Sequence, residues 1–163
     1  MDRRSILIVD TGPIWELVLY RAVNELGFLG LKRNLTYFDS VEAYENCGSF
    51  LSSFGRKTTS ASVVAELYHQ IRDTESGGHL HLWKQVYEEF ENMGMEENVV
   101  KLLDMDPDLV TKYGPTDVSL LEIARRNVNQ KPVILTLDTR LRSECVKAQI
   151  RSDLLIEVCN SRL

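Results

Sequence analysis

The sequence predicts one α/β domain over residues 1–163, with a mainly parallel central sheet between two layers of helices. Short apolar runs alternate along the chain with longer segments that have helical periodicity. No tight hairpin sequence joins these runs, so we expect neighbouring strands to be parallel and connected by helical crossovers. A length of 163 residues and an apolar content of 44% suit a single domain with one core.

The first strand is expected at Ile6–Val9, a wholly apolar run of the kind that is buried on both faces of a sheet. Residues 10–13 are turn formers and end this strand. A helix is expected over residues 14–26, with Pro13 at its first position. Its apolar positions, spaced by four, three and four residues, are Trp15, Leu19, Ala22 and Leu26.

Helices are expected through the next part of the chain. Within residues 27–57, Ser40 is a candidate cap for a helix that carries Val41. Residues 60–71 have a clearer helical pattern, with the apolar stripe Val64, Leu67 and Ile71. Glu66 lies among apolar neighbours in this helix, so we expect its carboxylate to point toward the edge of the core.

A helical insert is expected around residues 79–95, after the glycine-rich residues 76–78. Within it, a helix over residues 80–93 carries an aromatic stripe and is expected at the periphery. The stripe consists of Trp83, Tyr87, Phe90 and Met93. Packing on its own domain is the first interpretation of this stripe, and a homodimer interface is the second.

Three further strands are expected at residues 99–103, 132–137 and 154–158. A helix that begins near Asp117, with Thr116 as its cap, continues one face through Leu121, Ala124 and Val128. Another helix follows Asp138 and carries Leu141, Cys145 and Ala148. These positions complete a pattern in which strands and helices alternate.

Three aspartates occupy the places where open α/β sheets bind ligands, just beyond a strand or at the start of the next helix. Asp10 follows the first strand, Asp138 follows the strand over residues 132–137, and Asp117 opens a helix. Each alone is an ordinary turn or capping residue. Together with Glu66 they form a set of carboxylates that is costly to assemble unless a cation neutralises it.

This acidic set predicts a metal site. Oxygen ligands suit Mg²⁺ or Mn²⁺, and such ions promote phosphodiester hydrolysis without a histidine or cysteine. The net charge of −5 argues against a broad basic surface for nucleic acid, although basic residues occur in local groups. Among these, Arg140 and Arg142 are candidates for contacting phosphate.

Four segments in order resemble the PIN-domain nucleases, of which the VapC-like toxins are small members. They are ILIVDTG from Ile6, SVVAEL from Ser62, GPTDVSLLEIA from Gly114 and VILTLDTRL from Val133. The resemblance implies that Asp10, Glu66, Asp117 and Asp138 hold the metal, assisted by Thr136. The chain departs from the family in a longer interval between Asp10 and Glu66, and in Thr11-Gly12 where an Asn is frequent.

The resemblance further implies a metal-dependent endoribonuclease with an RNA substrate. It implies two candidate partners, which are an antitoxin, if the chain is the toxin of a toxin–antitoxin pair, and a second copy of the chain in a homodimer. Two alternatives stay open: a PIN-like protein-binding module without nuclease activity, and a nuclease that acts on DNA. Three widely spaced cysteines, without a partner Cys or His pair nearby, predict a reducing compartment, a cytoplasmic location and no structural zinc. No apolar run is long enough to span a membrane, and no signal-peptide core is present.

Overall fold

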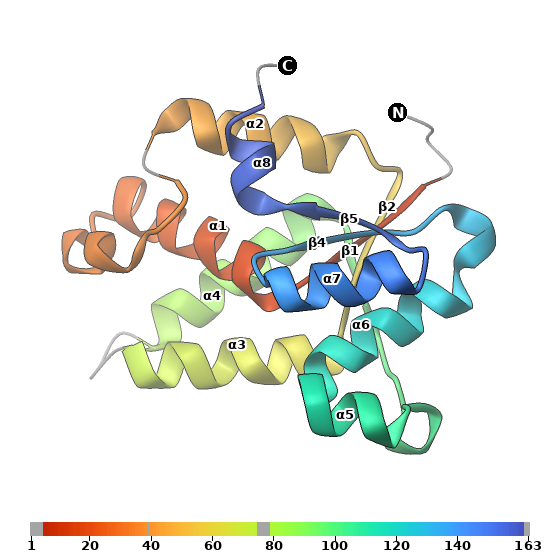
Figure 1. The fold of residues 1–163 in the computed structure, drawn as a ribbon. Helices are drawn as coiled ribbons and strands as arrows, with labels where there is room; N and C mark the ends of the chain where they lie inside the picture. Colours follow the sequence, from red (N-terminus) through yellow and green to blue (C-terminus); the bar gives the residue numbers. More distant parts are fainter. Residues whose placement is uncertain (1–4, 39, 75–78, 162–163) are drawn as a thin grey trace.

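The computed structural model describes residues 5–38, 40–74 and 79–161, so the glycine-rich residues 76–78 lie outside the described part. Its five strands form one parallel sheet in the order β3-β2-β1-β4-β5 (Figure 1). In chain order the elements are β1 (Ile6–Val9), α1 (Thr11–Asn24), η1 (Leu29–Asn34), α2 (Val41–Ser52), β2 (Arg56–Ser60), α3 (Ala61–Thr74), α4 (His79–Met93), β3 (Met95–Asn98), η2 (Leu102–Asp104), α5 (Pro107–Tyr113), α6 (Pro115–Arg126), η3 (Val128–Gln130), β4 (Val133–Thr136), α7 (Thr139–Lys147), β5 (Arg151–Leu154) and α8 (Leu155–Cys159).

Helices form a layer on each side of this sheet. The strands β1 to β3 progress toward one edge of the sheet and β4 and β5 toward the other. Right-handed crossovers therefore place α1 to α4 on one face and α5 to α7 on the opposite face. The contacts agree for α1, which packs against α4, and for α6, which packs on β1, β2 and β4, and α7, which packs on β4 and β5. Helix α3 contacts both α1 and α6. The predicted three-layer α/β/α architecture is confirmed.

The central strands β1 and β4 are the ones that the sequence predicts correctly. Both are buried at every position, as parallel strands covered on two faces should be. They pair in register from Leu7 opposite Val133, and the backbone N–H of Asp10 donates to the Leu135 carbonyl at 3.0 Å. The residues that follow these two strands therefore lie side by side at the carboxyl edge of the sheet.

The strand β2 was missed, because its sequence RKTTS contains no apolar residue. Its buried hydroxyls bond to neighbouring strands instead. Thr59 Oγ1 donates to the Val9 carbonyl at 2.7 Å, and Thr58 Oγ1 donates to the Glu96 carbonyl at 2.8 Å. Satisfied hydroxyl groups can therefore fill interior positions of the sheet that apolar side chains usually occupy.

Two of the predicted strands are wrong. Val99 is 71% and Leu103 96% exposed, and the edge strand is the preceding polar segment, β3. At the other edge, residues 151–154 form β5, and most of the run over 154–158 is helix α8. Leu155, Val158 and Cys159 are the buried residues of α8, a spacing that matches a helix rather than a strand.

Helix boundaries differ from the prediction at several ends. Helix α1 begins at Thr11, which places Pro13 inside its first turn, and it ends before Leu26, which is 46% exposed. Ser40 caps α2 as expected, since its side chain accepts the Ala43 N–H at 3.1 Å, but Val41 is exposed.

Two further details of the helices are corrected. Helix α6 is preceded by Gly114 and has no side-chain cap, so Thr116 does not serve as one. Val128 lies beyond the end of this helix and is 66% exposed. The buried stripe of α6 therefore ends at Ala124, four residues earlier than predicted.

Helix α4 is correctly placed but packs through a different face. Leu82 is fully buried and Val86 nearly so, whereas Tyr87 is 63% exposed. In addition, the buried carboxylate of Glu89 accepts a hydrogen bond from Arg21 of α1 at 2.7 Å. The helix is thus integrated into the layer that contains α1 and is not a peripheral insert, while the aromatic stripe flanks the buried face.

All three cysteines are buried, and none forms a disulfide. Burial raises the pKa of the Cys145 thiol to about 11 and that of Cys47 further. Thiols that stay protonated at neutral pH are poor nucleophiles. Cys47 and Cys145 are therefore packing residues.

Candidate metal centre

Four acidic side chains from four parts of the chain line one cavity at the carboxyl edge of the sheet. Asp10 follows β1, and Asp138 lies just beyond β4. Glu66 is on α3, and Asp117 is in the first turn of α6. The cavity has a volume of about 430 Å³, and its other wall residues are Thr11, Gly12, Gln70, Leu137, Thr139 and Arg140.

Asp10 is held by hydrogen bonds to both of its carboxylate oxygens. Its Oδ1 accepts the Thr11 N–H at 2.7 Å, which makes Asp10 the cap of α1. Its Oδ2 accepts the hydroxyl of Thr136 at 2.6 Å. The side chain is only 7% exposed, so its orientation is fixed by β1, α1 and β4 together.

Glu66 reaches the cavity from α3, and α1 orients it. The hydroxyl of Thr11 donates to Glu66 Oε2 at 2.8 Å, across 55 residues of sequence. The carboxylate is half-buried, as its position among apolar neighbours predicts. Gln70 follows one turn later on α3 and also lines the cavity, a residue that the i+4 spacing from Glu66 could have identified.

Asp117 is positioned through a contact between α6 and the end of β2. The hydroxyls of Ser119 and Ser60 are hydrogen-bonded at 2.7 Å and are both buried. Ser60 Oγ also accepts the N–H of Val63 at 3.2 Å, near the start of α3. One buried pair of serines therefore ties the helix that carries Asp117 to the helix that carries Glu66.

Asp138 caps α7, and its carboxylate pairs with an arginine. Its Oδ1 accepts the Arg140 N–H at 2.6 Å, and its Oδ2 lies 3.2 Å from the Arg140 guanidinium. Thr136 accepts the Asp138 N–H at 2.9 Å while it donates to Asp10. Thr136 is fully buried and does not line the cavity, so it positions the two aspartates from behind.

Burial and mutual repulsion disturb the pKa values of these acids. Desolvation, with a smaller contribution from Glu66 and Asp138, raises the pKa of Asp10 to about 6. Desolvation and then repulsion from Asp10 raise the pKa of Asp117 to about 7. Partial burial opposes ionisation of Asp138, but the hydrogen bonds from Arg140 outweigh it and lower the pKa. The cavity therefore holds more negative charge than nearby protein cations balance.

Gly12 lies close to the side chain of Leu137 at the cavity wall. A Cβ at this position would lie 2.6 Å from Leu137 Cδ1 and 3.0 Å from Leu137 Cγ. A side chain such as asparagine would therefore collide with Leu137 at the cavity wall. Glycine therefore lets the first turn of α1 lie directly against the Leu137 side chain.

The acids fit a hard divalent cation by donor type, because all four offer carboxylate oxygens. As placed, however, no group of three His, Cys, Asp or Glu side chains in the described part of the chain could hold a metal ion. The carboxylates of Asp10, Glu66 and Asp138 instead accept hydrogen bonds from protein donors. Coordination of one ion would therefore require these carboxylates to move toward a common point.

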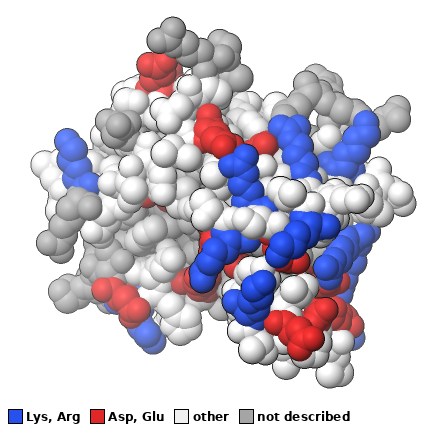
Figure 2. Space-filling view, viewed as in Figure 1, with Lys and Arg blue, Asp and Glu red and all other residues white. Residues whose placement is uncertain are grey.

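The two candidate phosphate-binding arginines differ in position. Arg140 lines the cavity, whereas Arg142 does not and pairs with Glu157 at 2.6 Å. Figure 2 shows Lys and Arg side chains gathered over the side of the molecule where α6 and α7 lie. Basic groups thus adjoin one side of the acidic cavity, although the chain as a whole is negatively charged.

No protein-family model matches the chain, and a search of curated proteins finds no match. The PIN-domain resemblance therefore rests on the four sequence segments, and membership of that family stays a prediction. No helix in residues 5–38, 40–74 and 79–161 is long and apolar enough to cross a membrane.

Proposed function

We propose that the chain is an endonuclease that hydrolyses RNA phosphodiester bonds with Mg²⁺ or Mn²⁺. The observation that carries this proposal is the arrival of Asp10, Glu66, Asp117 and Asp138 at one cavity from four separate segments. Ligand sites of open parallel sheets lie at this edge. The raised pKa values of Asp10 and Asp117 support a cation there, since a cation would stabilise their ionised forms.

The proposed roles follow from the contacts of each residue. The four acids would hold the ion, which supplies a water of lowered pKa and polarises a phosphate oxygen. Thr136 keeps Asp10 and Asp138 in place through its two hydrogen bonds. Arg140, whose side chain is 75% exposed at the cavity wall, offers its remaining N–H donors to the scissile phosphate. Hydrolysis forms a bond from water oxygen to phosphorus and releases a ribose oxygen, which takes a proton.

RNA is preferred over DNA as the substrate because of the PIN-domain resemblance. The toxin role with an antitoxin partner and the homodimer rest on the same resemblance, and both stay predictions. A second function, a protein-binding module without nuclease activity, is favoured by one observation. The described acids do not form a cluster ready to bind metal. Both functions predict the same fold and differ in metal binding and cleavage.

The test is cleavage of a fluorescent single-stranded RNA, and of the matched DNA, with Mn²⁺ or with EDTA. Asp10→Asn should abolish cleavage, whereas Asp73→Asn, which removes an exposed charge outside the cavity, should not. Titration calorimetry with Mn²⁺ gives a readout independent of activity. Absence of both Mn²⁺ binding and cleavage of either substrate would support the binding module, and cleavage that persists in Asp10→Asn would contradict the assignment of the site.

A further inference from the structure

A second cavity, of about 630 Å³, opens at the amino edge of the sheet, where β4 and β5 begin. Its size is that of a site for a small organic ligand. Three cationic residues line it, namely Arg125, Lys131 and Arg151, and none of its lining residues is acidic. This composition is the reverse of the acidic cavity and is unexpected in a chain of net charge −5.

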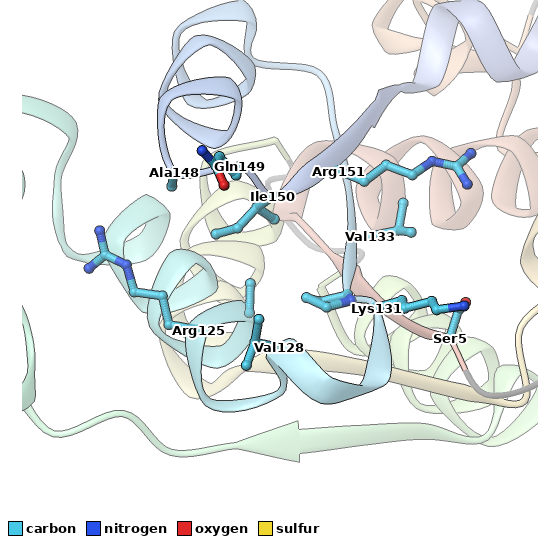
Figure 3. Close-up of a pocket in the computed structure, with 11 residues that line it drawn as sticks. Ser5, Arg125, Val128, Lys131, Val133, Ala148, Gln149, Ile150 and Arg151 are labelled. Atoms are coloured by element: carbon cyan, nitrogen blue, oxygen red, sulfur yellow. The ribbon is translucent and has the colours of Figure 1, made fainter.

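The cationic residues surround an apolar interior. Figure 3 shows Arg125 on one side of the cavity and Arg151, Lys131 and Ser5 on the other, with Val128 and Ile150 between them. The long basic side chains can bind an anion at the opening while an uncharged body contacts the aliphatic residues. The cavity therefore suits a ligand that is anionic at one end and apolar or planar at the other.

Two turns that line this cavity have unusual backbone conformations. Lys131, with a φ of 46°, ends η3, and Gln149, with a φ of 56°, follows α7. They are the two residues other than glycine with positive φ in the described part of the chain, and both line the cavity. Glycine adopts this conformation more easily, so the side chains are retained at some cost in stability. An ammonium and an amide group at the same cavity are consistent with a role in binding.

The arginines keep donors for a ligand. Arg125 pairs with Glu122, and Arg151 Nη2 lies 2.8 Å from Asp153, each contact using one nitrogen of a guanidinium with five N–H groups. Their side chains are 42% and 53% exposed, so the remaining donors are accessible. Lys131 and Arg151, which lie on the same side of the cavity (Figure 3), favour a phosphate over a singly charged carboxylate, since a phosphate carries more charge and more acceptor oxygens.

We propose that this cavity binds a nucleoside phosphate, with the phosphate at the basic residues and the base against Val128 and Ile150. The ligand is either a free mononucleotide or a terminal nucleotide of an RNA chain, which share this chemistry. The proposal does not depend on metal binding in the acidic cavity. The two sites lie at opposite edges of the sheet.

The test is fluorescence and calorimetric titration of the full chain with adenosine and uridine 5′-monophosphates, adenosine, inorganic phosphate and a short 5′-phosphorylated RNA. Saturable binding of nucleotide is expected to weaken about tenfold or more in Arg151→Gln and Lys131→Gln, because each loses a charge-assisted contact. Ala148→Phe should block the cavity without a change in charge. The matched controls Arg142→Gln and Val146→Phe change residues outside the lining and should bind as the wild type does.

Amide chemical shifts of the wild type give a readout that needs no variant. Addition of nucleotide should shift the amide resonances of Ser5, Gln149 and Ile150. Binding of the RNA alone, lost in Ala148→Phe, would identify the RNA end as the ligand. No saturable binding, equal affinity for inorganic phosphate and nucleotide, or shifts confined to the acidic cavity would overturn the proposal. Asp10→Asn should retain nucleotide binding, so failure of the nuclease proposal and failure of this one are distinguishable.

Discussion

Replacement of Asp10 by asparagine should destabilise the metal-free protein at acidic pH and stabilise it at basic pH. In the folded chain the pKa of Asp10 is about 6, above its ordinary value of 3.8. A raised pKa means that this group contributes stability below pH 3.8 and loses it as the pH rises through about 6. At about 1.4 kcal/mol per pKa unit, the loss amounts to about 3 kcal/mol.

Asparagine carries no charge, so this loss should be absent from Asp10→Asn. The variant gives up one hydrogen bond, because an amide nitrogen cannot accept as a carboxyl oxygen does, and this costs about 1 kcal/mol net. Without metal it should therefore be about 2 kcal/mol more stable than the wild type at pH 8, and about 1 kcal/mol less stable at pH 4.

The assay is urea denaturation in EDTA at a series of pH values, with Asp73→Asn as the control for removal of an exposed carboxylate. The difference between wild type and Asp10→Asn contains the contribution of Asp10 and the relief of its repulsion of Asp117. Equal losses of stability in the two proteins between pH 4 and pH 8 would refute the reasoning. Addition of Mn²⁺ at pH 8 should stabilise the wild type more than the variant, because a ligand that binds only the native state raises its stability.

Two predictions concern packing. Leu82→Ala should lower the free energy of unfolding by about 2–5 kcal/mol, and Tyr87→Ala by less than about 1 kcal/mol, because only Leu82 is fully buried; equal losses in urea denaturation would contradict the observed face of α4. Gly12→Ala should cost about 1–3 kcal/mol, since its Cβ would collide with Leu137. Gly48→Ala, with open space in α2, should instead stabilise by about 0.5–1 kcal/mol. A higher melting temperature for Gly12→Ala than for Gly48→Ala would show that the Leu137 side chain moves aside at little cost in stability.

The sequence predicted the central strands well because burial on both faces requires an apolar run, as in β1 and β4. It failed at β2, whose interior positions are threonine and serine, and at the edge strands β3 and β5, which are exposed and polar. An edge strand has no partner on one side, and polar residues there discourage pairing with other chains. A search for apolar runs therefore finds the middle of a sheet and misses its margins.

The site followed from topology more than from any one residue. Asp10 and Asp138 were placed by the strands that precede them, and Asp117 and Glu66 by helical register. The supporting contacts were not predictable, because the hydrogen bonds from Thr136 to Asp10 and from Thr11 to Glu66 span 126 and 55 residues. Such partners are fixed only when the sheet and its helices have been assembled.

The distance between the two cavities explains why the basic residues do not neutralise the acids. Ser5 precedes β1 and Asp10 follows it, so the cavities are separated by the length of a four-residue strand. That length is about 13 Å at about 3.3 Å per residue. It exceeds the screening length of about 8 Å at physiological salt. Arg125, Lys131 and Arg151 therefore leave the charge of the acidic cavity unbalanced, and a bound cation there would lower the raised pKa values of Asp10 and Asp117. The same separation leaves the basic cavity free to attract an anion of its own.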